Sequence, residues 1–176
     1  MAISDNSFDW KKGDGEYPFD HRLSPVLDFI GFEMERVSAT SIEGRFVVSE
    51  RSAQAYGVLH GGISAFLAES LGSLGAFITS GFQPVAGVEV STSHFQPAPI
   101  GMEIEVKATP MHIGRRLQVW EVKLISAKSS QKDLPKQESS KTSEPGLIAL
   151  SKLTASKLSS NLSAKSQDAK KIPSKL

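Results

Sequence analysis

The residue that stands out chemically is Glu69, a carboxylate within the most apolar helical stretch of the chain, GVLHGGISAFLAESLGSLGAF (57–77). Large apolar side chains recur there at helical spacing and predict a core face from which Glu69 is turned away: Ile63, Phe66, Leu67, Leu71, Leu74, Phe77 and Ile78. The residues three and four positions from Glu69 are mostly small, which would let another backbone approach that side closely. The sequence therefore predicts a carboxylate held at a covered contact. The alternative is a solvent-facing Glu on an ordinary amphipathic helix.

The start of the same helix, LHGG, offers a second kind of chemistry. The first N–H groups of a helix lack intrahelical partners and carry the positive end of the helix dipole. Gly61 and Gly62 leave these groups uncovered, so that they suit an anion or a developing oxyanion. The alternative is that His60 is a plain cap and the glycines a plain turn. Oxyanion donors and a recessed carboxylate on one helix together favour acyl transfer or proton abstraction.

The elements that must position these groups are about six strands around one long helix. A short helix is expected in SPVLDFIG, with Ser24 as N-cap and Gly31 as terminator. The long helix is expected at 61–80, and a tight turn at Ile113-Gly114. Strands are predicted in FEMERVSAT, SIEGRFVVSE, VAGVEVSTSHFQPA, MEIEVKATPMHIG, RRLQVWEVKLISA and GLIALSKLTAS. One long helix among these strands predicts an α+β fold, an antiparallel sheet packed around that helix.

Length and composition predict one domain with irregular ends. The chain has 176 residues and a net charge of +1, enough for one core and no field that would attract nucleic acid or an anionic membrane. It contains no cysteine, which excludes disulfides, thiolate catalysis and cysteine-based metal sites. No stretch reads as a membrane span. We expect a disordered segment at 1–20, a domain at 21–158 with a polar insert at 128–145, and a flexible tail at 159–176.

The chain ends in Ser174-Lys175-Leu176, the tripeptide that acts as a peroxisomal address at a free C-terminus. Ser-Lys-Leu also occurs at 151–153 and 156–158, so that coincidence in a Ser/Lys-rich tail is the alternative. We expect a peroxisomal protein that contacts the import receptor through its last three residues.

One stretch, QAYGVLHGGISAFLAESLGS, with VAGVEVSTSHF and HIGRRLQVWEVKL downstream, resembles the hotdog-fold acyl-CoA thioesterases. The resemblance extends over about 23–158 without the 128–145 insert. The spacing of its polar residues is similar to the branch that contains 1,4-dihydroxy-2-naphthoyl-CoA thioesterases, whose plant members also end in a peroxisomal tripeptide. The resemblance implies a hotdog fold and hydrolysis of an aromatic acyl-CoA in phylloquinone biosynthesis. It also implies a homodimer or a dimer-of-dimers tetramer, and no metal or cofactor, because CoA is part of the substrate.

The resemblance also implies a role for each matching residue. Glu69 would be the general base on water or the nucleophile on the thioester, and the Gly61 N–H would polarise the thioester carbonyl. His60 and Gln54 would orient the thioester, and Ser73 would hold the carboxylate or its water. The remaining substrate and CoA contacts would come from Gly62, Gly87, His94, Phe95, Gln96, Pro97, His112, Ile113, Gly114, Arg115, Arg116 and Leu117. Arginines on a turn suit phosphates in any case, although a solvated basic turn is the alternative.

Helix geometry predicts that two chains share the site. At about 1.5 Å per residue, Glu69 lies roughly 12 Å along the helix axis from Gly61. A bound carbonyl needs its donors and its attacking group at about 3 Å. One straight helix cannot supply both, whereas a second copy running antiparallel across a two-fold axis can.

Other functions stay open at this level. Within the thioesterases, a benzoyl-CoA-type or a broad acyl-CoA enzyme would use the same residues. A hotdog dehydratase would pair His60 with the acidic Glu69. A binding protein without catalysis would need no carboxylate beside a thioester, so that Glu69 argues against this class.

Overall fold

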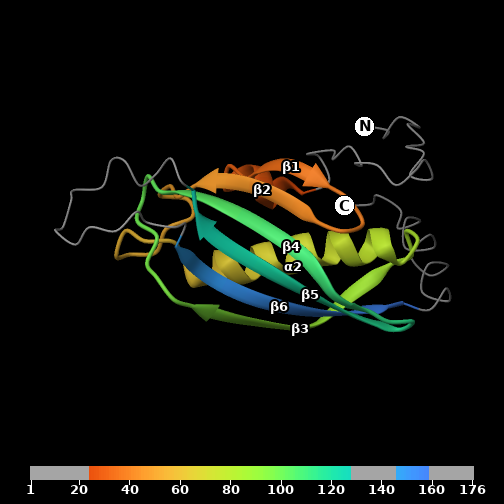
Figure 1. Ribbon diagram of the computed structural model, residues 1–176. Helices are drawn as coiled ribbons and strands as arrows, with labels where there is room; N and C mark the ends of the chain where they lie inside the picture. The colour runs from red at the N-terminus through yellow and green to blue at the C-terminus, as the bar shows by residue number, and fades with distance from the viewer. Residues whose placement is uncertain (1–23, 128–145, 159–176) are drawn as a thin grey trace, which may run out of the picture.

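The computed structural model describes residues 24–127 and 146–158, which form one antiparallel sheet wrapped around a long helix (Figure 1). The elements in chain order are α1 (Pro25–Phe29), β1 (Glu33–Val37), β2 (Ile42–Val47), α2 (Gly61–Thr79), β3 (Val85–His94), β4 (Glu103–Ile113), β5 (Leu117–Ser126) and β6 (Leu147–Lys157). The predicted α+β class, six strands around one long helix, is confirmed. The predictions for 1–20, 128–145 and 159–176 lie outside the described residues.

Strand order in the sheet is β1-β2-β4-β5-β6-β3, and every neighbouring pair is antiparallel. β3 follows α2 in the chain but pairs with β6, so that α2 crosses the sheet before β3 joins its far edge (Figure 1). Most β3 residues are exposed, and Val88 keeps 63% of its surface. A ten-residue strand at the edge of the sheet presents backbone groups that another chain can pair with.

Helix α2 packs on the sheet through its smallest residues. A Cβ at Gly72 would lie 2.6 Å from Leu153 Cδ2 of β6, and one at Gly75 would lie 2.5 Å from Trp120 Cζ3 of β5. The buried positions of the helix are Ser64, Leu67, Ala68, Leu71, Gly72, Gly75, Ala76 and Ile78. Because Trp120 and Leu153 already fill the space between the layers, only small residues fit opposite them.

The expected core face of α2 is present. Leu67, Leu71 and Ile78 are buried as predicted. Ile63, Phe66 and Leu74 are partly buried and pack against the same core. Phe77 is also partly buried, and its ring makes an edge contact with Phe82.

A buried amide holds the C-terminal end of α2 on β5. Gln118 is 1% exposed, and its Oε1 accepts hydrogen bonds from Thr79 Oγ1 at 2.7 Å and from the Trp120 indole N–H at 3.1 Å. Its Nε2 donates to the Ala76 carbonyl oxygen at 3.2 Å. A buried polar group with its partners in place fixes one packing arrangement. The network therefore sets the position of the helix that carries Glu69.

Local turns follow the sequence closely. Ser24 occupies the N-cap position of α1, although its side chain makes no capping hydrogen bond, and Gly31 follows the helix at φ 73°. The β4–β5 turn is formed by residues 114–116 and is shifted from the predicted Ile113-Gly114, because β4 extends to Ile113. By length and mean hydropathy (1.3) α2 could cross a membrane, but it lies inside this sheet as the core helix.

Candidate active site

The N-terminus of α2 is capped by the residue that precedes it. His60 Nδ1 accepts a hydrogen bond from the Gly62 N–H at 2.8 Å. This bond requires an unprotonated Nδ1, so that the neutral ring carries its proton on Nε2. The cap bonds the N–H of Gly62 and not that of Gly61. As one of the first N–H groups of the helix, the Gly61 N–H has no acceptor within the helix.

The loop before α2 is tied to the segment after β3. The Leu59 N–H donates to the Ala98 carbonyl oxygen at 2.7 Å, and the His60 N–H donates to the Ser52 carbonyl oxygen at 2.9 Å. Gln54 closes a turn in this loop, because its N–H donates to the Val58 carbonyl oxygen at 2.8 Å. These bonds place the helix start beside the end of β3.

A pocket of about 390 Å³ opens at this point. The His94 ring borders Gly61, where an added Cβ would lie 3.1 Å from Cε1 and 3.3 Å from Nε2. The pocket is lined by Gln54, Val58, Leu59, Gly61, Ser64, His94, Phe95, Gln96, Pro97, Ala98 and Ile148. The structure thus brings together Gln54, Gly61 and the 94–97 segment, as the sequence predicted.

Ser64 is a polar residue of this pocket that the sequence interpretation missed. It is 0% exposed, and within the described residues its Oγ has no hydrogen-bond partner. The available signal was a hydroxyl on the helix face that otherwise carries Leu67 and Leu71.

Glu69 lies in a second place, farther along the helix. Ser73, one turn later, donates from Oγ to Glu69 Oε1 at 3.2 Å. A Cβ on Gly87 of β3 would lie 2.5 Å from Glu69 Oε2 and 2.7 Å from Cδ, so that the carboxylate rests against the backbone of β3. In the part of the chain that the structure describes, no Lys, Arg or His side chain forms an ion pair with it. The predicted close backbone is therefore that of β3.

Strand register separates the two places. His94, beside Gly61, pairs with Ala149 of β6, whereas Gly87, beside Glu69, pairs with Ala155. At about 3.3 Å per residue these positions are roughly 20 Å apart along β6. The predicted site residues therefore form two groups within one chain, one around Gly61 at the helix start and one around the Glu69 carboxylate at its middle.

The predicted CoA-binding turn lies nearer to the carboxylate group. Leu117 pairs with Ser156, the neighbour of Ala155 in β6. The turn is closed by the Gly114 N–H, which donates to the Leu117 carbonyl oxygen at 2.9 Å. The exposed residues of the turn and its flanks are His112, Ile113, Arg115, Arg116 and Leu117. The structure does not bring this turn to the pocket at the helix start of the same chain.

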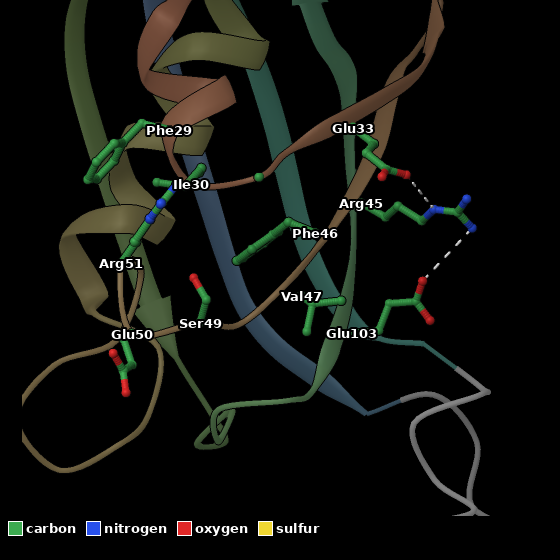
Figure 2. A pocket seen from close by; sticks show the side chains of 11 residues that line it. Phe29, Ile30, Glu33, Arg45, Phe46, Val47, Ser49, Glu50, Arg51 and Glu103 are labelled. Atoms are coloured by element: carbon green, nitrogen blue, oxygen red, sulfur yellow. Dashed lines mark hydrogen bonds and ion pairs between the residues drawn. The ribbon is translucent and has the colours of Figure 1, made fainter.

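A larger cavity, about 680 Å³, lies elsewhere, between α1 and the β1–β2 side of the sheet (Figure 2). Arg45 projects there between Glu33 (3.4 Å) and Glu103 (3.9 Å). Arg51 lies over the Phe29 ring at 5.4 Å. Both guanidinium groups of this cavity already have partners, and none of the predicted site residues lines it.

Comparison with known proteins agrees with the fold and identifies the family of the chain. Residues 56–131 match the thioesterase superfamily. The chain is 43% identical over 109 residues to 1,4-dihydroxy-2-naphthoyl-CoA thioesterase 2 of Arabidopsis thaliana, an alignment that covers 62% of this chain and 69% of that protein. It is 34% identical over 104 residues to 1,4-dihydroxy-2-naphthoyl-CoA hydrolase of Escherichia coli (strain K12), covering 58% and 76%.

Among solved structures, a thioesterase from Haemophilus influenzae superposes with a TM-score of 0.64 at 27% identity, covering 83% of this chain and 95% of that one. The chain belongs to the thioesterase superfamily and has the hotdog fold. The enzyme class predicted from the sequence, an acyl-CoA thioesterase, is confirmed.

Proposed function

We propose that the enzyme hydrolyses the thioester of an aromatic acyl-CoA, 1,4-dihydroxy-2-naphthoyl-CoA of phylloquinone biosynthesis, to the free acid and CoA. The substrate is supported by the 43% identity to the Arabidopsis thaliana enzyme of that name. The observation that carries the chemistry is Glu69, held by Ser73 at 3.2 Å on a helix whose N-terminus opens into a pocket.

In the proposed reaction, the thioester carbonyl oxygen accepts a hydrogen bond from the Gly61 N–H at the positive end of α2. Glu69 removes a proton from water as the water oxygen attacks the acyl carbon. The tetrahedral intermediate then collapses, the carbon–sulfur bond breaks, and the CoA sulfur leaves and takes up the proton. His60 and Gln54 orient the thioester at the helix start, and Ser73 keeps the carboxylate in place.

The alternative role of Glu69 is covalent. Its carboxylate would attack the acyl carbon and expel the CoA thiolate, and water would then cleave the mixed anhydride. A single turnover in water labelled with oxygen-18 distinguishes the two routes, because only the anhydride route can place the label in Glu69. Both routes need the same carboxylate and the same N–H donor.

The active unit is a homodimer, alone or paired into a tetramer, because one chain holds the two groups too far apart. A second copy related by a two-fold axis brings its Glu69 to the first copy's Gly61, and its Arg115-Arg116 turn to the mouth of that pocket. The arginines meet the phosphates of CoA there. The exposed edge strand β3, with Val88 on its surface, is a surface that a second copy can cover.

The cellular site of the reaction is the peroxisome. Support comes from the terminal Ser174-Lys175-Leu176, which the import receptor reads as a free C-terminus. These residues lie outside the described part of the chain.

The proposal is tested with a panel of aromatic and aliphatic acyl-CoA thioesters, followed by reaction of the released thiol with a dye. We expect the highest kcat/KM with the dihydroxynaphthoyl thioester, and a kcat at least about a hundredfold lower for Glu69→Gln. A preference for benzoyl-CoA, or none among acyl groups, would replace the substrate by the broader thioesterase alternative. Binding without hydrolysis, or hydration of an enoyl-CoA instead, would overturn the proposal.

A further inference from the structure

The carboxylate of Glu69 occupies space that any residue other than glycine would fill at position 87. A Cβ there would collide with Glu69 Oε1 and lie 2.5 Å from Oε2 and 2.7 Å from Cδ. All three of its nearest neighbours belong to this one carboxylate. The carboxylate of Glu69 is thus in contact with both the backbone at Gly87 and the Ser73 hydroxyl.

Glycine is required at position 87 because a Cβ does not fit there, and not because the backbone adopts a conformation that only glycine tolerates. Positive φ values occur at Gly31, Gly57, Gly81 and Gly101 among the described glycines, and Gly87 is not one of them. Gly87 lies in regular antiparallel pairing with Ala155, immediately before a register shift between Gly87 and Glu89. An alanine is therefore free of backbone strain there.

The cost of a methyl group at position 87 falls on Glu69 and not on the fold. Its obstacles are the end of a flexible side chain, and within the single chain Gly87 is exposed on an edge strand. The carboxylate can rotate away, which breaks its bond with Ser73 but leaves the core untouched. Addition of a methyl group should thus displace the carboxylate at little cost in stability.

We infer that Gly87 is a positioning residue, which holds the Glu69 carboxylate at its reactive place by leaving room for it on β3. This inference rests on the proposed role of Glu69. A displacement of about 1 Å can cost a reaction up to roughly a hundredfold in rate. Because the methyl group displaces the attacking group, we expect the loss mainly in kcat, although the resemblance also implies a substrate contact at Gly87.

The experiment measures kcat, KM and the melting temperature for Gly87→Ala, Glu69→Asp and the double variant. Ala86→Ser is the matched control, since it adds one atom at the preceding exposed position, whose side chain points to the other face. We expect Gly87→Ala to lower kcat about a hundredfold, with KM within about threefold and an unchanged melting temperature. Ala86→Ser should keep the wild-type kcat.

The double variant distinguishes a positioning role from other effects. The aspartate side chain in Glu69→Asp is one methylene shorter and leaves the space beside β3 free. Gly87→Ala should therefore cost less than about threefold in the Glu69→Asp background. Equal losses in both backgrounds, an effect on KM alone, or a wild-type kcat for Gly87→Ala would each overturn the inference. Full activity of Glu69→Gln would instead remove the proposed function, and is read independently.

Discussion

Gly75→Ala tests how much the close contact between α2 and the sheet contributes to stability. The new Cβ would lie 2.5 Å from Trp120 Cζ3 and 2.8 Å from Cζ2. Trp120 is 0% exposed, and its indole N–H is bonded to Gln118 at 3.1 Å, so that the ring cannot withdraw without breaking that bond. Overpacking of this kind costs about 1–3 kcal/mol, and the better helix propensity of alanine returns about 1 kcal/mol.

We therefore expect Gly75→Ala to lower the free energy of unfolding by up to about 2 kcal/mol, which corresponds to a melting temperature up to roughly 8 °C lower for a chain of this length. Gly72→Ala is the matched control on the same helix. Its Cβ meets the buried Leu153 at 2.6 Å from Cδ2 and 3.2 Å from Cβ, and since Leu153 has no side-chain hydrogen bond to break when it shifts, the loss should be smaller.

The assay is thermal unfolding followed by circular dichroism, at one protein concentration because dimerisation would shift the midpoint. A Gly75→Ala protein more stable than the wild type would contradict this expectation, since the indole would then yield freely and only the gain in helix propensity would remain. A larger loss for Gly72→Ala than for Gly75→Ala would show that Leu153, and not Trp120, is the rigid contact.

Three further predictions concern CoA, the tail and acid stability. Changing both Arg115 and Arg116 to Ala should raise KM for an acyl-CoA at least about tenfold but barely for a pantetheine thioester, and equal effects would remove the phosphate assignment. Deleting 174–176 should leave kcat and melting temperature unchanged while a tagged protein leaves peroxisomes; a loss of stability would contradict a pure address. The pKa of Glu43 lies below its usual value because Lys107 and Ser41 donate hydrogen bonds to it. The ionised Glu43 therefore stabilises the fold above about pH 4.5, and this stabilisation is lost as the pH falls through the lowered pKa. Between about pH 5 and 3, the free energy of unfolding of Glu43→Gln should thus fall less than that of the wild type. Parallel curves of stability against pH for the two proteins would contradict this.

The elements themselves could be predicted because each depends on local pattern. The long helix begins at Gly61 as expected, since the glycines and His60 mark its start, and each expected strand is present within a few residues of its predicted bounds. Glu69 lies off the core face, as helical spacing alone requires. The same local information supplied the class of chemistry, because oxyanion donors and a carboxylate lie on one element.

The helix face and the division of the site could not be predicted in the same way. The sequence predicted that large side chains of the helix face the core, whereas Gly72 and Gly75 contact the sheet. Their partners, Leu153 and Trp120, belong to strands much later in the chain, so that the helix sequence alone does not reveal these contacts. The contact between Glu69 and Gly87 depends on β3 lying at the sheet edge beside β6. Periodicity within a strand does not reveal strand order, so that neither contact was visible in the sequence.

The central claim is that one reactive site needs the Gly61 N–H of one chain and the Glu69 carboxylate of another. Its most direct test mixes two inactive variants, Glu69→Gln and Gly61→Pro, which lacks the N–H donor. Proline is tolerated in the first turn of a helix, so that the fold should survive. Gly61→Ala is the control, because it adds a Cβ near His94 but keeps the N–H.

After co-refolding in equal amounts, random pairing makes half of the dimers mixed, and each mixed dimer has one intact site of two. We predict recovery of up to about a quarter of wild-type activity from two proteins that are inactive alone. If mixed dimers form, as shown by native mass spectrometry, and no activity returns, then the site lies within a single chain and the account is wrong.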